Sequence, residues 1–375
     1  MPEKQTANTE IKRINRKRIY QLLREKSELS RQDIVVDLRL CLPTVTQNLL
    51  ELQAEGLLSE SGSVGNTGGR RAKTYSVVNN ARLAIGLDIT RRHITVVAVD
   101  LSGNVVNRIR IRQDFEQAKP YYKKLGTLVE EIISSAQIDQ SKLLGVGIAV
   151  PGLITEDNRT VFYGKILDFT GLTCSEFSQF IPNKSAFYND ANAAGFAEIW
   201  ANKSINNAFY LMLSNNIGGS VLIGNQLYPG ENIRSGEVGH ITIVPDGRPC
   251  YCGQKGCVDP YCAATVLSDL TDGNLEQFFQ LLRDGSPAAI KAWKEYLHYL
   301  AITVNNLRML FDCRIILGGY VGAYMDDYIN DFKKLAASRN TFEKTADYVQ
   351  ACRYKTESIA AGAALHFIDS FIAGI

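Results

Sequence analysis

The chain has 375 residues, of which 45% are hydrophobic and 21% charged, and a formal net charge of +2. Its length predicts two or three domains, and its mean hydropathy of −0.09 is ordinary for a soluble globular protein. No apolar run approaches the roughly 18 residues of a membrane-spanning helix. The N-terminus also lacks the apolar core of a secretory signal. We therefore expect a cytoplasmic protein, in which cysteines stay reduced.

Positive charge is concentrated at the N-terminus, where residues 1–80 hold 13 basic and 9 acidic side chains. An apolar pattern of helical period covers residues 11–26, with basic residues around it. A second helix is predicted to begin at Ser30, because "SRQD" offers a capping serine with a carboxylate three residues later. The segment "PTVTQNLLELQAEGLL" predicts a third helix that opens near Pro43 and ends at Gly56.

The next segment, "LSESGSVGNTGGRRAKTYSVV", predicts two strands around a glycine-rich tip. Three short helices followed by a basic hairpin describe a winged helix-turn-helix, whose third helix enters the major groove of DNA. We expect DNA contacts from polar residues early in that helix and from arginines at the hairpin tip: Thr44, Thr46, Gln47, Asn48, Arg70 and Arg71. The alternative is a helical protein-interaction domain with a solvated basic face. Residues 79–82 are expected to be a linker.

After this basic head, strands alternate with helices, which predicts an α/β body. Two segments, 83–106 and 207–230, begin with the same strand–turn–strand pattern. We therefore expect two related lobes with a ligand cleft between them. The predicted units are a DNA-binding domain over 1–80, a first lobe over 81–192 completed by a C-terminal helix over 356–375, and a second lobe over 193–355.

A motif in the second lobe carries a family resemblance. The stretch "GEVGHITIVPDGRPCYCGQKGCVD" has a Glu-x-Gly-His turn followed at fixed spacing by Cys-x-Cys-Gly-x-x-Gly-Cys and an acidic residue. Together with "YNDANAA", "ILGGYV" and the predicted winged helix, it resembles the ROK family over essentially residues 10–375. The resemblance implies an actin-like ATPase (ribonuclease H-like) fold with two lobes. That family includes sugar kinases and repressors of sugar operons, and the N-terminal head is typical of the repressor branch.

The cysteine motif predicts a metal site. His240, Cys250, Cys252 and Cys257 form a Cys₃His set, the ligand combination of closed tetrahedral zinc sites. Glycines inside the motif would let the chain turn tightly enough for the thiolates to face one ion. We expect one structural Zn²⁺ per chain, because four protein ligands leave no open position. The alternative is a group of reduced, unliganded cysteines.

The resemblance also implies a sugar site. In the family, the residues that match Asn189, Asp190, Glu237, His240 and Asp259 meet the hydroxyl groups of a sugar. Asp259 departs from the glutamate usual at its position, which puts that contact in doubt. Asp190 matches the general base of the family's kinases, and we expect it here to anchor a hydroxyl. The alternative is that Asp190 only caps the helix that follows it.

The two phosphate loops of the kinases are altered. Thr90 and Arg91 replace the glycines of the first loop, and Ser214, Asn215 and Asn216 open the second. Side chains there obstruct the backbone's approach to phosphate, so we expect no enzyme activity. The expected function is a repressor released from operator DNA by a monosaccharide or sugar phosphate, acting as a homodimer or dimer of dimers. Xylose, glucose and N-acetylglucosamine all fit. The alternatives are a sugar kinase with a DNA-binding head and a repressor released by a protein partner.

Overall fold

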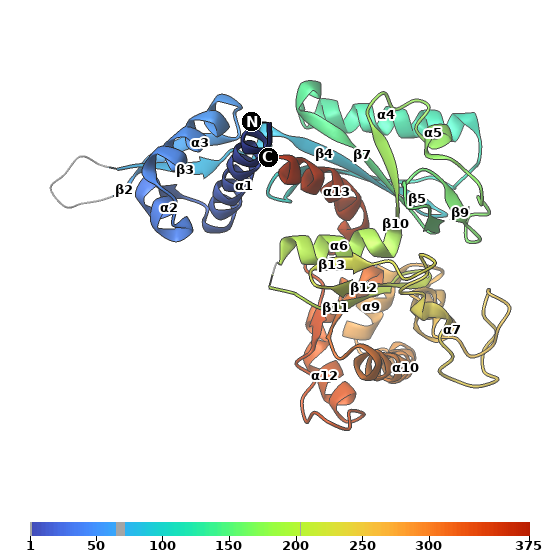
Figure 1. Cartoon of the computed structure of the whole chain (residues 1–375). Helices are drawn as coiled ribbons and strands as arrows, with labels where there is room; N and C mark the ends of the chain where they lie inside the picture. The colour runs from blue at the N-terminus through green and yellow to red at the C-terminus, as the bar shows by residue number, and fades with distance from the viewer. Residues whose placement is uncertain (1, 65–71, 203) are drawn as a thin grey trace.

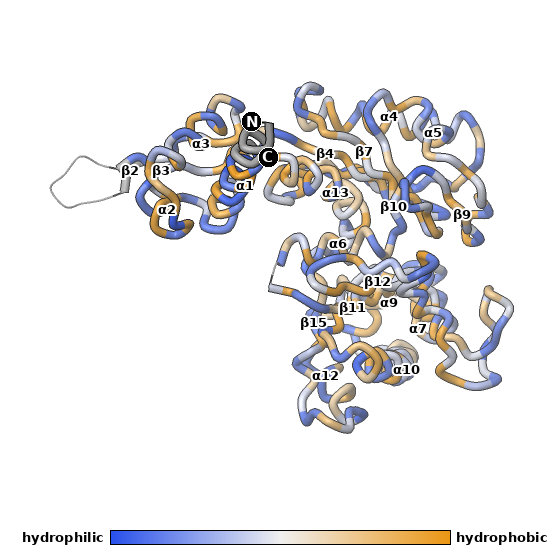
Figure 2. The backbone as a smooth tube through the Cα atoms, in the orientation of Figure 1, coloured by the Kyte–Doolittle hydropathy of each residue, from blue (hydrophilic) through white to orange (hydrophobic). Residues whose placement is uncertain are grey.

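The computed structural model describes residues 2–64, 72–202 and 204–375. It has a small N-terminal head and a body built around two five-stranded sheets (Figure 1). Strands of both sheets are dominated by apolar residues (Figure 2), because each sheet is covered by helices. Within the described residues, no helix is long and apolar enough to cross a membrane.

The head consists of helices α1 (Pro2–Lys26), α2 (Arg31–Leu38) and α3 (Leu42–Ala54), with strands β1 (Leu29–Ser30), β2 (Leu58–Val64) and β3 (Ala72–Val77). The cap predicted at Ser30 is confirmed: Ser30 and Asp33 form a reciprocal capping box at the start of α2. Gly56 follows α3 with φ +71°, a conformation that favours glycine at a helix end. Arg70 and Arg71 lie outside the described residues.

The head packs directly on the body. Residues 79–82, expected to be a linker, lie between β3 of the head and β4 of the body; they contain the 3₁₀ helix η1 (Asn79–Ala81), in which Ala81 is buried. The buried apolar side chains of the head, such as Ile19, Tyr20 and Leu23, belong to one cluster with residues of β4, β5 and the C-terminal helix. An apolar interface of this kind holds the head at a defined orientation.

The first lobe contains a sheet in the order β10-β7-β4-β5-β6. Its strands are β4 (Leu83–Ile89), β5 (His93–Asp100), β6 (Val105–Arg112), β7 (Leu143–Val150) and β10 (Ser185–Asn189). Helix α4 (Lys119–Ser135) covers one face, and α13 (Ser358–Gly374) covers the other (Figure 1). The short elements of this lobe are η2 (Gln140–Lys142), β8 (Leu153–Ile154), β9 (Val161–Tyr163) and α5 (Cys174–Phe177).

Helix α13 lies unusually close to the strands beneath it. A Cβ atom placed on Gly86 would lie 1.8 Å from the carbonyl oxygen of Ala360, and one on Gly147 would lie 2.2 Å from that of Ala363. On its other side, a Cβ on Gly362 would lie 1.8 Å from the carbonyl oxygen of Ala193 in helix α6 (Asp190–Ala201). Only glycine permits such backbone contacts, so α13 is fixed between the first sheet and α6.

The second lobe contains a sheet in the order β13-β12-β11-β14-β15. Its strands are β11 (Ala208–Leu213), β12 (Ile217–Ile223), β13 (Gln226–Tyr228), β14 (Arg314–Gly318) and β15 (Val349–Ala351). The helices of this lobe are α7 (Asp259–Cys262), α8 (Thr265–Ser268), α9 (Leu275–Arg283), α10 (Pro287–Phe311), α11 (Gly319–Gly322) and α12 (Ile329–Ala337). Helix α6 (Asp190–Ala201) follows β10 and runs between the two lobes (Figure 1).

Candidate functional site

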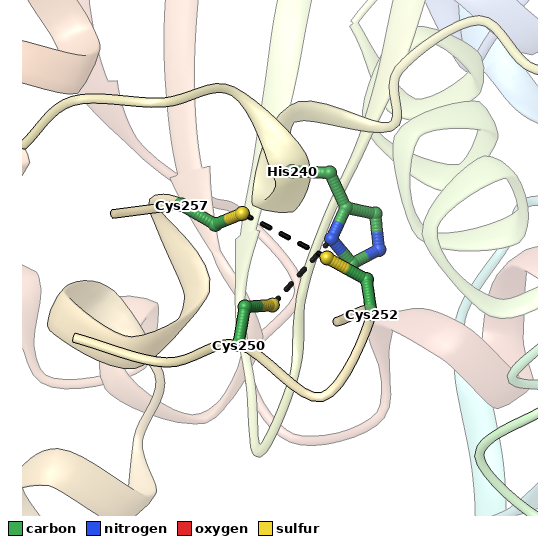
Figure 3. A group of neighbouring side chains, drawn as sticks. All are labelled: His240, Cys250, Cys252 and Cys257. Atoms are coloured by element: carbon green, nitrogen blue, oxygen red, sulfur yellow. Dashed lines mark hydrogen bonds between the residues drawn. The ribbon is translucent and has the colours of Figure 1, made fainter. Parts of the chain in front are cut away.

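The four predicted metal ligands come together in one cluster. The ligand atoms of His240, Cys250, Cys252 and Cys257 all lie within 4.8 Å of one another (Figure 3). The Sγ atoms of Cys252 and Cys257 are 3.8 Å apart, and Cys250 Sγ is 3.7 Å from His240 Nδ1. Ligands of a tetrahedral zinc ion with Zn–S near 2.3 Å lie about 3.5–3.8 Å from each other. The geometry therefore fits such an ion.

The backbone of residues 248–257 is turned so that its thiols converge. Gly253 and Gly256 have φ values of +96° and +76°, which permit the two reversals of the loop. The Cys250 N–H donates to Gln254 O, and the Gly256 N–H donates to Arg248 O. Burial raises the pKa of the Cys250 thiol to about 12 and raises that of Cys257. The pKa of Cys252 is lowered, chiefly by a backbone hydrogen bond from Gln254. A bound cation would stabilise all three cysteines as thiolates, the form that binds a metal.

His240 joins this cluster to a cavity between the lobes. Its Nδ1 faces Cys250, whereas its Nε2 lies 3.2 Å from the hydroxyl of Tyr251 and 4.0 Å from Glu237 Oε2. Burial and the charge of Lys165 both lower the pKa of His240, which favours the neutral imidazole. A cation held at Nδ1 would leave the proton on Nε2, as a donor directed at the cavity.

Four of the five predicted sugar-contacting residues line that cavity. Its wall includes Asn189, Asp190, Glu237 and His240. The first two come from the end of β10 and the start of α6, and the other two from η3 (Val238–His240) and the residue before it. Groups separated by almost 50 residues thus meet across the two lobes.

Asp259, the fifth predicted residue, is not in the cavity wall. Its side chain is buried, and its Oδ1 accepts the backbone N–H of Ile217 at 2.7 Å. Burial raises the pKa of this carboxyl, and a hydrogen bond from the side chain of Asn216 partly offsets the rise. Asp259 thus fixes the backbone at the start of β12, where Asn216 and Ile217 do line the cavity.

The carboxyl groups of the cavity are held in an environment that disfavours their charge. Burial is the main cause that raises the pKa of Asp190 to about 7, and the charges of Asp88 and Glu237 raise it further. Burial raises the pKa of Glu237 as well. The cap of α6 is Asn189, whose Oδ1 accepts the Asn192 N–H at 2.9 Å. The cap role considered for Asp190 is therefore filled by its neighbour.

Tyr251 and Lys165 are among the residues of the cavity wall that were missed from the sequence. Tyr251 stands between two of the cysteines, and its ring meets that of His240 edge to face at 5.2 Å. Lys165 belongs to the loop after β9 and brings a cation to the wall. The carbonyl of Ile166, next to Lys165, accepts a hydrogen bond from the guanidinium of Arg91 at 2.5 Å. The position of Tyr251 inside the cysteine motif could have indicated that it lies in the site. No sequence signal indicates Lys165.

The turn after β4, expected to match the first phosphate loop of the kinases, is hydrogen-bonded internally. Thr90 Oγ1 donates to the carbonyl of His93 and accepts the His93 N–H. The guanidinium of Arg110, on β6, lies over the ring of Tyr320, on α11 of the second lobe, at 5.8 Å. Below this turn Asp88 is buried, and its Oδ1 has no hydrogen-bond partner among the described residues. Burial raises the pKa of Asp88 to about 7. The Arg110–Tyr320 contact therefore joins the two lobes, and the charge of Arg110 also acts on Asp88.

The predicted DNA-contacting residues of the head differ in exposure. Gln47 is exposed on α3 and donates to Glu51, while Thr44 and Thr46 are half-buried. Asn48 is a correction: it is only 2% exposed, and its Nδ2 donates to the carbonyl of Thr44 at 2.8 Å. Since its side chain packs inside the head, Asn48 cannot present an amide to a base edge.

Comparisons with known proteins agree with this architecture. The sequence matches the family described as "ROK family" over residues 84–369. The chain is 28% identical over 319 residues to a xylose repressor of Bacillus spizizenii, covering 82% of each. It is 25% identical over 281 residues to an N-acetylglucosamine repressor of Escherichia coli O157:H7, covering 72% of this chain and 67% of the relative.

Solved structures share the fold. A ROK family transcriptional regulator, a homologue of the Escherichia coli MLC protein, matches with a TM-score of 0.73 and 21% identity over 97% of each chain. A ROK family glucokinase from Streptomyces griseus, in complex with glucose and AMPPNP, matches with a TM-score of 0.63 and 23% identity over 76% of this chain and 98% of its own. The matched residues cover more than half of the chain, which therefore belongs to the ROK family.

Proposed function

We propose that the chain is a transcriptional repressor of a carbohydrate-utilisation operon, released from its operator by a sugar or sugar phosphate bound between the lobes. The observation that carries this proposal is the cavity in which Asn189, Asp190, Glu237 and His240 meet. Amide, carboxylate and imidazole groups together donate to and accept from neighbouring hydroxyls, as recognition of a sugar requires. The xylose and N-acetylglucosamine repressors among the relatives support the same class.

The head is proposed to be a winged helix-turn-helix that places α3 in the major groove. Its helix order, the β2–β3 hairpin after α3 and the exposure of Gln47 support this role. Lys12 and Arg16 of α1 pair with Glu51 of α3, which fixes the angle between these helices. A repressor that reads two half-sites works as a two-fold dimer, so we propose a homodimer acting on DNA in the cytoplasm.

The cysteine cluster is proposed to hold one structural zinc ion. His240, Cys250, Cys252 and Cys257 would supply four ligands, so no position would remain for a substrate. The ion would neutralise the thiolates and fix the loop that carries Tyr251. Because His240 belongs to both sites, its orientation toward the sugar depends on the integrity of the cluster.

Sugar phosphorylation is not part of the proposal. Thr90 and Arg91 stand where the kinases have the glycines of the first phosphate loop, and their side chains bond to His93 and to the carbonyl of Ile166. A nucleotide phosphate would have to displace these contacts and would find few free backbone N–H groups there. A general base contributes to the rate only when the hydroxyl that it deprotonates can attack a positioned phosphate. Without that phosphate, the remaining role of Asp190 is to bind the sugar hydroxyl.

A thermal-shift screen tests the proposal. Purified protein is heated with D-xylose, D-glucose, N-acetylglucosamine and their phosphates, since a ligand of the native state raises the melting temperature. Duplexes bound by the protein are selected from a random library, and the stabilising sugar is then added to the complex. We expect one sugar to raise the melting temperature and release the duplex. A protein that selects no duplex, or keeps it with every stabilising sugar, would refute the proposal.

A further inference from the structure

The head touches the body at the end of the helix that starts in the cavity. Helix α6 begins at Asp190, and Trp200 lies ten residues later, about 15 Å along the helix at 1.5 Å per residue. The guanidinium of Arg24, on α1 of the head, lies over the Trp200 ring at 4.5 Å. A single rigid helix therefore carries a cavity residue at one end and the head contact at the other.

The same end of α6 is fastened to the crossing between the lobes. The carboxylate of Glu198 is buried and accepts the backbone N–H groups of Arg353 and Tyr354 at 2.9–3.1 Å. These residues lie on the segment that returns from the second lobe to α13. The hydroxyl of Tyr354 in turn donates to the carbonyl of Gly103, in the β5–β6 turn. A change in the angle between the lobes would therefore displace the C-terminal end of α6.

Trp200 has little room to move without affecting its neighbours. A Cβ on Gly103 would lie 2.4 Å from the Trp200 ring, so this glycine allows the turn to pack against the indole. Trp200 itself is 8% exposed and belongs to the cluster that contains Tyr20 and Leu23 of α1. Packed interiors respond to displacement by shifting as units, because they contain few voids. Rotation of α6 would move Trp200 against α1.

The contact on the head side is suited to release. Within the described residues, the Nε of Arg24 and the hydroxyl of Tyr20 are buried without hydrogen-bond partners. Burial lowers the pKa of Arg24, which shows that its cation is partly desolvated against the indole. A cation–π contact of this kind is weak and depends on the ring's position. A modest rotation could break it, and water would then solvate both polar groups.

We propose that α6 transmits occupancy of the cavity to the head, and that Arg24 and Trp200 are the positioning residues that receive it. This inference rests on the proposed function and adds the route of regulation. Sugar bound at Asp190 would favour one position of α6, and the Arg24–Trp200 contact would convert that position into an orientation of α3. By linkage, operator bound to the head would act on α6 to the same extent.

The test separates coupling from binding. Arg24→Gln and Trp200→Leu are each measured for operator affinity, sugar affinity and the sugar concentration that releases operator. Both are expected to bind sugar as the parent does, and to need at least about tenfold more sugar for release, within the usual range of coupling between sites. Arg24→Lys keeps a cation over the indole and should restore most of the response. Melting temperatures show whether each variant is folded.

A matched control addresses the route. Arg82 makes the same kind of contact at the same boundary, but with Phe371 of α13, at 5.5 Å. Arg82→Gln should keep the parent's release. Normal release by both Arg24→Gln and Trp200→Leu would overturn the inference, as would an equal loss in Arg82→Gln. A parent protein that selects no duplex would instead refute the proposed function, and with it this inference.

A second readout does not depend on knowing the sugar. The chain has two tryptophans, and Trp293 is buried in the second lobe, so Trp293→Phe leaves Trp200 as the only indole. Addition of the selected duplex should change the emission of Trp200, because operator would shift the head on α6. The change should disappear when Arg24→Gln is added. An emission that does not respond to duplex would overturn the inference.

Discussion

Replacing Asp190 with asparagine should weaken sugar binding without weakening operator binding. The carboxylate lines the cavity, and among the described residues it accepts one hydrogen bond from another residue, the Ala191 N–H at 2.8 Å. Its remaining lone pairs are free for sugar hydroxyls, and one charge-assisted hydrogen bond contributes about 1.5–3 kcal/mol. Loss of that bond corresponds to roughly 10- to 150-fold weaker affinity. Calorimetric titration at pH 8, where the carboxylate is ionised, measures the change.

The same substitution should stabilise the protein without sugar. Burial raises the pKa of Asp190 to about 7, so the folded state holds this proton more tightly than the unfolded state does. The free energy of unfolding therefore falls as pH rises from about 4 to 7, and asparagine escapes this loss. Asp190→Asn should melt like the parent at pH 4 and higher than the parent at pH 8.

Asp88 supplies a matched control. It is also a buried carboxyl whose pKa is raised to about 7, but it is not in the cavity wall. Asp88→Asn should gain stability at pH 8 and keep the parent's sugar affinity. An Asp190→Asn protein that binds sugar and leaves the operator as the parent does would refute the anchoring role. A variant that loses stability at pH 8 would refute the reasoning about its burial.

Three further predictions concern the other sites. Metal analysis should find about one zinc per chain, and Cys252→Ser should lose it. Cys262→Ser should retain the zinc, because the Cys262 sulfur lies outside the cluster. Zinc at full stoichiometry in Cys252→Ser would contradict the ligand set. Replacing both Arg70 and Arg71 with alanine should reduce the slope of operator affinity against salt by about two counterions, whereas Gln47→Ala should change the preferred duplex; a double variant with the parent's slope would exclude the hairpin tip from DNA. Millimolar ATP should leave the melting temperature unchanged, and a saturable shift would reopen the kinase alternative.

The metal cluster was predictable because its ligands are local. His240 and the three cysteines lie within 18 residues, and the glycines between them indicate the chain reversals that bring the thiols together. The cap at Ser30 was predictable for the same reason, because its partner is three residues away. In both cases one short segment of the sequence contains all the groups that determine the geometry.

Other residues depend on partners that sequence spacing does not reveal. Asp259 was expected in the sugar site, but the backbone N–H of Ile217, 42 residues earlier, takes its carboxylate. Asn48 was expected to contact DNA, yet the packing of three helices turns it inward. Lys165 reaches the cavity from a loop with no motif of its own. Tertiary packing decides each of these positions, and a pattern along one segment cannot anticipate it.

The close fit of α13 has a consequence for biosynthesis. Strands β4 and β5 emerge early from the ribosome, but the helix that covers one of their faces lies at residues 358–374. Until that helix is made, Gly86 and Gly147 face an empty groove, and the apolar side chains shared with the head remain exposed to water. The nascent chain therefore exposes apolar surface, which favours aggregation, over most of its synthesis.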